Sequence, residues 1–317
     1  MLNNYKYFIA LADEKNISRA AEKLFISHQC LSKYLKTLEQ HYDVTFFERT
    51  PQLAITPAGE AFLDTVRKIQ MLEMNFESQL DDIKHSKRGS IRFGTTEGRY
   101  RILVPGLLSA FRKIYPDVML EVSYATSEQL IENILDNELD LVLINESPVD
   151  RNKLDTQSLL EEKLYLVISD NMLAKYFSDS YPKCKKIFET KGVDLSLFSH
   201  VPFIFNKKGF NSRAALDAFT ESHGINLNCV MELTQLDLHF MISSQDYAAS
   251  FCWSMYIPTI RDMNKAHPDN ELNIFPLRKF NAHNHMVLLT KKGKILPEYG
   301  RVLIRLIRNA CSAFTLS

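Results

Sequence analysis

The chain has 317 residues, of which 45% are hydrophobic and 24% charged, a composition typical of a folded globular protein with about two domains. Its 38 basic and 38 acidic residues cancel, so net charge gives no support to nucleic-acid binding, and any such contact must come from a local arrangement. No apolar run approaches the roughly 18 residues of a membrane span, and residues 1–15 lack a signal-peptide cleavage pattern. We therefore expect a cytoplasmic protein with no membrane partner.

The cysteines predict neither a disulfide framework nor a zinc site. They are odd in number, widely separated and without a CxxC pair: Cys30, Cys184, Cys229, Cys252 and Cys311. His283 and His285 could ligate a metal, but two histidines in a polar loop before a strand more often face solvent. The sequence has no glycine-rich phosphate loop, HExxH helix or GxSxG elbow. We expect no metal, no cofactor and no catalytic residue.

Residues 3–14 predict a short helix, and residues 17–42 predict two further helices joined by a tight turn. Asn16 and Ser27 are placed to cap these two helices, because each side chain can accept a hydrogen bond from the free N–H groups of a first turn. Small residues in the earlier helix let the later one pack closely across it. Such a pair is a helix-turn-helix, whose later helix can enter the DNA major groove. An ordinary helical hairpin with a polar outside is the alternative.

The helix that follows Ser27 has two different faces. Apolar residues recur at helical spacing and form the face that we expect inside: Cys30, Leu31, Tyr34, Leu35 and Leu38. Polar residues recur about half a turn away and form the outer face: His28, Gln29, Ser32, Lys33 and Lys36. We expect the two lysines to hold phosphate or guanine, and the three uncharged side chains to read base edges.

A small β ribbon is predicted after this helix. Residues 50–56 alternate like a strand pair and form a candidate wing that touches the DNA backbone. Arg49 stands at its start and could reach a DNA phosphate. A salt bridge from Arg49 to Glu48 or Glu39 is an alternative of equal weight.

A long helix is predicted from Pro57, which suits a first helical turn, with Thr56 as its cap. Its apolar residues are spaced by three or four, as in the seam of a coiled coil: Ala58, Phe62, Val66, Ile69, Leu72, Phe76, Leu80 and Ile83. A rod of about 30 residues and about 45 Å cannot bury this stripe on the small domain that precedes it. We therefore predict a homodimer through this helix, followed by a hinge at residues 84–89.

A set of family-typical motifs runs through residues 1–88: Tyr7-Phe8, Ala20-Ala21, Leu24, Ser27, Leu31-Ser32-Lys33, Leu38-Glu39, Phe47-Glu48-Arg49 and Thr56-Pro57-Ala58-Gly59. On these motifs the chain resembles the LysR-type transcriptional regulators. The resemblance implies a winged helix-turn-helix DNA-binding domain at 1–56, a dimerisation helix and hinge at 57–88, and an effector-binding domain at 89–317.

The sequence departs from the family pattern in the helix-turn-helix. Asp43 stands where the family usually has a helix-ending glycine, and Asp can adopt the left-handed conformation that this position needs. His28 and Gln29 replace the usual Gln-Pro, and the wing is one residue shorter. Because His28 and Gln29 are expected to read bases, the family's preferred half-site is not assumed for this chain.

Strands and helices alternate in the remaining residues, which predicts parallel sheets covered by helices on both faces. We expect strands at 90–94, 118–124, 139–144, 164–168, 201–205, 229–233, 248–253, 272–276 and 285–290, and helices at 102–115, 128–137, 212–224, 236–243 and 297–313. The resemblance implies a two-lobed α/β fold like that of periplasmic binding proteins. Lobe I would span about 89–163 and 267–317, and lobe II about 164–266.

The resemblance also implies a small-molecule effector, often an anion, in the cleft between the lobes. Four polar residues at or just past predicted strand ends are expected to contact it: Thr96, Ser127, Asn206 and Gln235. Loop capping is an alternative of equal weight for each, because short polar residues after strands also satisfy backbone groups. Cys229 and Cys252 could form a redox switch as in some family members. Buried structural cysteines are the stronger expectation, since no basic neighbour is present to lower a thiol pKa.

These features together predict a regulator of transcription that binds double-stranded DNA in a sequence-specific way and responds to a small-molecule effector. We expect a homodimer through residues 57–86 and a homotetramer through the effector-binding domain, with RNA polymerase as a further candidate partner. The alternative is a solute-binding or enzymatic α/β protein with a helical oligomerisation arm. That alternative requires an export signal or a catalytic cluster, and the sequence has neither.

Overall fold

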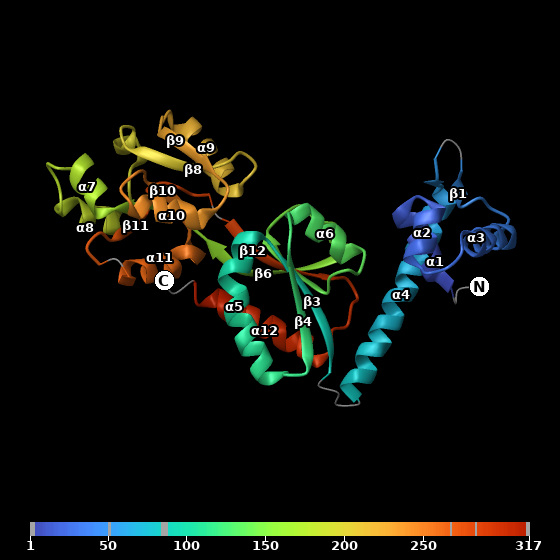
Figure 1. Ribbon diagram of the computed structural model, residues 1–317. Helices are drawn as coiled ribbons and strands as arrows, with labels where there is room; N and C mark the ends of the chain where they lie inside the picture. Colours follow the sequence, from blue (N-terminus) through green and yellow to red (C-terminus); the bar gives the residue numbers. More distant parts are fainter. Residues whose placement is uncertain (1–3, 50–51, 84–87, 267, 283, 315–317) are drawn as a thin grey trace. The chain divides into compact units, whose positions relative to one another are not determined.

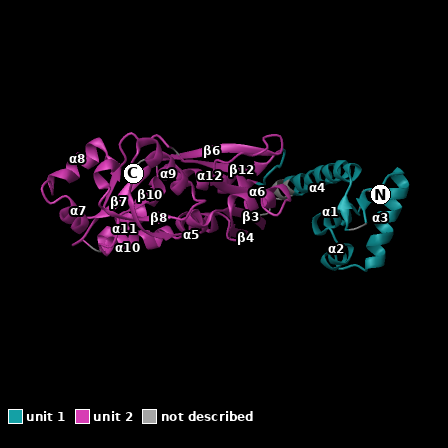
Figure 2. Cartoon of the chain, turned by 90° about the horizontal axis from the view of Figure 1, so that it is seen from above, with its two compact units in different colours: residues 1–85, 293–297 teal, residues 86–292, 298–317 magenta. Residues whose placement is uncertain are grey.

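The computed structural model describes residues 4–49, 52–83, 88–266, 268–282 and 284–314 (Figure 1). The chain forms two compact units: unit 1 is Met1–His85 with Gly293–Pro297, and unit 2 is Ser86–Lys292 with Glu298–Ser317 (Figure 2). The predicted fold class is confirmed, with N-terminal helices, a long helix and a mixed α/β region in that order. Residues 50–51 of the expected wing and 84–87 of the expected hinge lie outside the described residues. None of the helices in the described part of the chain is both long and apolar enough to cross a membrane.

Unit 1 begins with three short helices, α1 (Tyr5–Glu14), α2 (Ile17–Lys23) and α3 (His28–Tyr42). Both predicted caps are present. The Asn16 side chain accepts a hydrogen bond from Arg19 N at 3.1 Å, and Ser27 Oγ accepts one from Cys30 N at 3.2 Å. α3 ends at Asp43, which adopts the left-handed conformation with φ of 53°.

The core of unit 1 is formed by the inner face of α3 and a group of aromatic rings. Leu31 and Leu35 are fully buried, and the Phe8 ring of α1 lies 4.7 Å from the Phe62 ring and 5.4 Å from the Phe46 ring between centroids. Cys30, which we expected on the inner face, is exposed. The reason is angular, because position 30 lies about 100° around the helix from the direction of the buried leucines.

Three elements follow α3: β1 (Phe47–Glu48), β2 (Ala54–Ile55) and α4 (Pro57–Ile83). β1 and β2 pair in antiparallel fashion and form the ribbon. Thr56 Oγ1 accepts a hydrogen bond from Gly59 N at 3.1 Å and so caps the first turn of α4, as predicted. Gly59 has no room for a side chain, because a Cβ there would lie 2.3 Å from Phe46 O.

Unit 2 contains two α/β lobes, of which lobe I has a five-stranded sheet in the order β4-β3-β5-β12-β6. The strands are β3 (Gly89–Thr95), β4 (Val118–Tyr124), β5 (Leu141–Asn145), β6 (Leu154–Glu162) and β12 (Asn284–Lys291), and the helices are α5 (Glu97–Ile114), α6 (Ser127–Leu135) and α12 (Glu298–Ser312). β3 runs parallel to β4 and β5, as predicted. β12 instead pairs in antiparallel fashion with β5 and β6, so the sheet is mixed.

Lobe II is built on the sheets β10-β7-β11 and β8-β9. Its strands are β7 (Leu164–Ser169), β8 (Pro202–Asn206), β9 (Asn228–Leu233), β10 (Ser250–Trp253) and β11 (Leu272–Pro276). Its helices are α7 (Asp170–Tyr176), α8 (Lys183–Lys191), α9 (Asn211–His223), α10 (Leu236–Ser244) and α11 (Ile257–Ala266), with short 3₁₀ segments η2 (Leu195–Phe198) and η3 (Ser254–Tyr256). The two sheets are joined where Ile204 N donates to Ala249 O and Ala249 N donates to Pro202 O, each at 2.8 Å.

Two boundaries in unit 2 differ from the sequence expectation. β11 pairs with β7 of lobe II, so the chain returns to lobe I after Pro276 rather than near residue 267. The sequence could not assign this strand to a lobe, because its pattern of buried residues fits either sheet. α5 begins at Glu97 rather than at residue 102. Its first turn is polar and lacks the apolar spacing of the later turns, so the sequence pattern did not identify it as helical.

Candidate functional site

The outer face of α3 presents the predicted DNA-contacting side chains to solvent. His28, Gln29, Lys33 and Lys36 are exposed, and Ser32 is half-buried. Within the described part of the chain, no hydrogen bond or ion pair holds the side chain of Lys33 or of Lys36. Two unpaired ammonium groups on one helical face can bind phosphate oxygens or the acceptor edge of guanine.

The one carboxylate of α3 is turned away from that face. Glu39 Oε1 accepts hydrogen bonds from Phe46 N at 2.8 Å and Phe47 N at 3.2 Å, and so ties β1 to α3. Arg49 Nη2 lies 3.5 Å from Glu39 Oε2. Arg49 therefore forms the salt bridge that was one of its two alternatives, although 52% of its side-chain surface remains exposed.

The apolar stripe of α4 is buried in its first half and exposed in its second half. Val66 is fully buried in the core of unit 1, whereas Leu72 and Phe76 are 67% and 60% exposed. These two large apolar side chains lie one helical turn apart and so share one exposed face of α4.

A buried ion pair lies where the chain passes from lobe I to lobe II. Arg99 in the first turn of α5 and Glu162 at the end of β6 are 5% and 0% exposed, and Arg99 Nη2 lies 3.1 Å from Glu162 Oε2. Asn284 Nδ2 donates to the same carboxylate oxygen at 2.8 Å. Arg99 also donates to Asn145 Oδ1 and, at 3.0 Å, to Thr96 Oγ1. Burial raises the pKa of the Glu162 carboxyl, while Arg99 beside it favours the ionised form.

The two lobes meet closely beside this ion pair. Met255 N of lobe II donates to Glu162 Oε1 at 3.4 Å. Gly98 of lobe I leaves no room for a side chain, because a Cβ there would lie 2.1 Å from Tyr256 Oη of lobe II. The start of α5 is therefore packed directly against lobe II.

Two of the predicted effector residues, Thr96 and Gln235, lie on helices that face each other across the lobes. They are the N-cap residues of α5 and α10, and a salt bridge of 3.6 Å between Arg101 and Asp237 joins these helices near their starts. Neither Thr96 nor Gln235 caps its helix with its side chain. The loop-capping alternative is therefore absent at both positions.

The other two predicted effector residues have different surroundings. Ser127 is the first residue of α6, and its neighbour Thr126 supplies the cap by accepting from Gln129 N at 3.3 Å. Asn206 is buried and donates to Ser212 Oγ at 2.6 Å, while its Oδ1 has no hydrogen-bond partner. In the described part of the chain no side-chain hydrogen bond joins Thr96, Ser127, Asn206 and Gln235 to one another.

His239, one turn beyond Gln235 on α10, is a buried histidine with an incomplete set of partners. Its side chain is 1% exposed, Nε2 lies 3.4 Å from Leu233 O, and Nδ1 has no hydrogen-bond partner. Burial lowers the pKa of the imidazole to about 4. His239 is therefore neutral at pH 7.

We expect the free energy of unfolding to fall by about 2 kcal/mol when the pH is lowered from 7 to 5, because of His239. The imidazole of the unfolded chain takes up a proton near the ordinary pKa of 6.5, whereas the folded chain resists protonation until about pH 4. The stability that depends on neutral His239 is therefore complete above pH 6.5 and is lost as the pH falls. Urea denaturation at pH 7 and pH 5 measures this change.

The pH effect is assigned to His239 by comparing two variants. His239→Gln should lack this share of the pH dependence, whereas His28→Gln on the exposed face of α3 should retain it. Equal pH dependence in the wild type and in His239→Gln would contradict the assignment.

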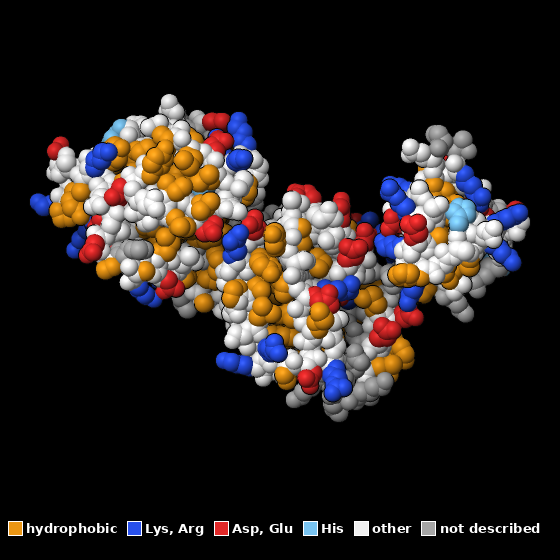
Figure 3. All heavy atoms as spheres, in the orientation of Figure 1, with side chains coloured by type: hydrophobic (Ala, Val, Ile, Leu, Met, Phe, Trp, Pro, Cys, Tyr) orange, Lys and Arg blue, Asp and Glu red, His pale blue; other side chains and the backbone are white. Residues whose placement is uncertain are grey.

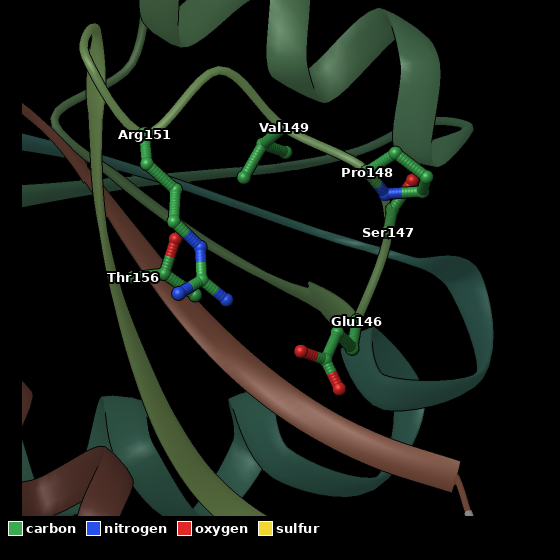
Figure 4. A pocket seen from close by; sticks show the side chains of 6 residues that line it. All are labelled: Glu146, Ser147, Pro148, Val149, Arg151 and Thr156. Carbon is green, nitrogen blue, oxygen red and sulfur yellow. The ribbon is translucent and has the colours of Figure 1, made fainter.

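Two surface cavities of unit 2 have linings that include none of the predicted effector residues. One, of about 340 Å³, is lined by Glu146, Ser147, Pro148, Val149, Arg151 and Thr156. Figure 4 shows the Arg151 and Glu146 side chains both extending into this space. The other, of about 550 Å³, lies between α5 and β4 and includes Leu108, Phe111 and Met119.

Cys229 corrects one of our expectations about the cysteines. All five cysteines are free, and Cys252 is buried as expected, but Cys229 is exposed. The exposure follows from its position in β9, a strand at the edge of its sheet that pairs only with β8. No group of three potential ligands in the described part of the chain is placed to hold a metal ion, and His283 lies outside the described residues.

Arg99, Glu162 and Asn284 are the polar residues that sequence reasoning missed. The sequence did contain a signal for Arg99. A cation in the first turn of a helix is unfavourable next to the positive end of the helix dipole, which indicates that a carboxylate lies nearby to stabilise it. Glu162 gave no such signal, since a glutamate at the end of a polar strand is usually solvated.

Two family models match the chain. Residues 2–60 match the model described as "Bacterial regulatory helix-turn-helix protein, lysR family". Residues 84–312 match the model described as "LysR substrate binding domain", which covers more than half of the chain.

Curated relatives and solved structures match between 69% and 98% of the chain. The chain is 24% identical over 297 residues to the HTH-type transcriptional activator CmpR of Synechocystis sp., covering 93% of this chain and 90% of that protein. It is 25% identical over 223 residues to the HTH-type transcriptional regulator CysL of Bacillus subtilis, covering 69% of each. A full-length OxyR variant from Pseudomonas aeruginosa has a similar fold, with a TM-score of 0.64, 18% identity and 97% of each chain covered. Full-length CbnR, in complex with its target DNA, gives a TM-score of 0.53 at 18% identity, covering 98% of this chain and 99% of that one.

Proposed function

The chain belongs to the LysR family of transcriptional regulators, and from that premise we propose that α3 binds the major groove of promoter or operator DNA while a small molecule between the lobes of unit 2 modulates this binding. The proteins of this family regulate transcription and are not enzymes. The alternative of an enzyme or solute carrier is therefore set aside.

The free lysines of α3 are the observation that carries the DNA-binding proposal. Lys33 and Lys36 are exposed and unpaired among the described residues, and Glu39, the one carboxylate of the helix, is engaged by β1 and Arg49. Lys33 and Lys36 therefore form a local cationic surface on a domain that has as many acidic as basic residues. His28, Gln29 and Ser32 stand on the same face and would read base edges.

Arg49 would contact a DNA phosphate by leaving Glu39. The Arg49 side chain remains exposed in its salt bridge with Glu39, and exposed ion pairs contribute little stability. A phosphate, which offers the guanidinium two acceptors in a fork, is a stronger partner for it.

A homodimer would form through the second half of α4. Leu72 and Phe76 are exposed on one face of the helix, at positions that continue the spacing of the buried Val66. Pairing two copies of α4 along this stripe would bury both side chains and present two α3 helices to DNA. Two half-sites would then be bound at once.

Leu72→Pro is expected to abolish association through α4 and so to halve the mass of the assembly. Proline in a helix interior removes a backbone hydrogen bond and costs about 3 kcal/mol, so the second half of α4 would lose the straight stripe that pairing needs. Light scattering should then report two chains of 36.6 kDa each, joined through the effector-binding domain, where the wild type is a tetramer. Leu72→Asp, which keeps the helix but charges the stripe, should give the same mass, and Glu77→Gln should leave the wild-type mass unchanged. An unchanged mass in both Leu72 variants would reject the dimer through α4.

Unit 2 would supply a second association surface and so a tetramer. β4 is an edge strand of the lobe I sheet, and Met119 and Tyr124 on it are 63% and 57% exposed. Leu108 and Ile114 of α5 are exposed as well. Figure 3 shows hydrophobic side chains gathered where α5 and β4 lie in Figure 1. An exposed apolar face on an edge strand suits contact with another copy of the chain.

The effector would bind between the lobes, where α5 and α10 face each other. Thr96 and Gln235 do not cap their helices with their side chains, and Asn206 has a buried oxygen without a partner. Ser127 at the start of α6 completes the proposed set. A ligand there would change the contacts of both lobes at once. We place the protein in the cytoplasm, where promoter DNA and RNA polymerase are available to it.

A salt titration of DNA binding tests the proposed function. The full chain is mixed with its own upstream DNA in a shift assay at increasing salt. If four lysines of a dimer each neutralise one phosphate, the logarithm of the binding constant should fall against the logarithm of salt with a slope of about −3.6. A slope near zero, or no preference over unrelated DNA, would reject the proposal.

A further inference from the structure

Phe25, in the turn between α2 and α3, combines an unusual backbone with a fully exposed ring. Its φ is 55°, in the left-handed region, and its side chain is 96% exposed. Its N–H donates to Glu22 O and the N–H of Ile26 donates to Ala21 O, each at 3.0 Å. These two bonds form the Schellman ending of α2, in which the left-handed position is usually glycine.

Phenylalanine is an unfavourable residue at this position for folding alone. A left-handed φ is disfavoured for any residue with a Cβ. The Phe25 ring is exposed to water, so it does not contribute the stabilisation that a buried ring would. Its neighbours Leu24 and Ile26 pack against the core of unit 1, whereas the turn directs Phe25 away from the chain. Unfavourable backbone and exposed apolar surface at one residue point to a contact with another molecule.

The position of Phe25 indicates which molecule this is. Phe25 stands just before Ser27, the cap of α3, and therefore beside the end of α3 that carries His28 and Gln29. In a helix-turn-helix this end of the second helix meets the base edges. The apolar group that the major groove offers there is the C5 methyl of thymine. We propose that Phe25 packs against a thymine methyl in the bound DNA and so contributes to sequence preference, an inference that rests on the proposed function.

Replacement of thymine by uracil in the DNA tests this contact. Uracil lacks the methyl group but keeps the charge and hydrogen-bonding groups of thymine. The full chain is titrated with its own upstream duplex and with the same duplex in which every thymine is replaced by uracil. The wild type should bind the thymine duplex more tightly, by about fourfold for each methyl contacted by Phe25. In Phe25→Ala the ratio of the two affinities should fall by this factor.

Further variants separate folding from DNA contact. Phe25→Gly suits the left-handed backbone, so its melting temperature should equal or exceed that of the wild type while the thymine-to-uracil ratio falls as in Phe25→Ala. Phe25→Leu should restore part of the ratio, because it keeps an apolar side chain.

The outcomes that would overturn this inference differ from those that would overturn the proposed function. A wild-type ratio of one, or an unchanged ratio in Phe25→Ala, would overturn the methyl contact, and so would equal weakening of Phe25→Ala on both duplexes. In each case salt-dependent binding by the wild type would leave the proposed function standing. Absence of salt-dependent binding by the wild type would remove both.

Discussion

Lys33→Glu is expected to weaken binding of the full chain to its own upstream DNA by about 100-fold or more. A hydrogen bond to a charged group contributes about 1.5–3 kcal/mol, and a dimer loses two such contacts while gaining two repulsive carboxylates. Lys33 forms no ion pair or hydrogen bond with the described residues, so the change should not reduce stability. The salt slope should become shallower by about 2, one for each lysine removed from the dimer. A shift assay at several salt concentrations measures both quantities.

A matched charge reversal distinguishes a local contact from general repulsion. Lys113→Glu makes the same substitution at an exposed position of α5 in unit 2 and should change the affinity less than threefold at moderate salt. If both variants bind equally well, or if Lys33→Glu binds as the wild type does, α3 is not the helix that contacts DNA.

Glu162→Ala is expected to reduce the free energy of unfolding by about 3–5 kcal/mol. The substitution leaves the Arg99 guanidinium buried without its counter-charge. It also removes one of the two acceptors of Asn284 Nδ2 and the acceptor of Met255 N. Urea denaturation of the full chain at pH 7, followed by circular dichroism, measures the loss.

Two controls assign this loss to the buried pair. Glu97→Ala removes one of the two carboxylates that pair with the exposed Arg101 and should cost less than about 1 kcal/mol. The double variant Arg99→Met with Glu162→Leu should recover most of the lost stability, because no unpaired charge is left in the interior. A cost for Glu162→Ala as small as that for Glu97→Ala would show that the pair does not hold the lobes.

Local signals allowed much of unit 1 to be predicted. The caps at Asn16 and Ser27 depend on side chains bonding to backbone only three residues away, so spacing alone identifies them. The left-handed ending at Asp43 is likewise local. The start of α4 followed from Thr56 and Pro57, which have fixed roles at the beginning of a helix.

Contacts between distant residues could not be predicted in this way. From the sequence, Glu39 is expected to be a surface residue of α3. The hydrogen bond that it accepts from Phe46 N depends on the position of β1 beside the helix, which the sequence does not give. Arg99 and Glu162 are 63 residues apart, and no periodicity relates them. The effector residues were predicted from strand ends, which fix a side of the sheet but not the direction of each side chain.

The balance of charge in unit 1 has a consequence for how the protein finds its site. Bulk DNA attracts any cationic surface, and a bacterial genome offers millions of competing positions to a strongly basic protein. Residues 1–88 carry 12 basic and 12 acidic residues, and Lys33 and Lys36 on the outer face of α3 have no ion-pair partner among the described residues. Molecules of this kind spend less time trapped on irrelevant sequence, so a small number of copies can keep an operator occupied.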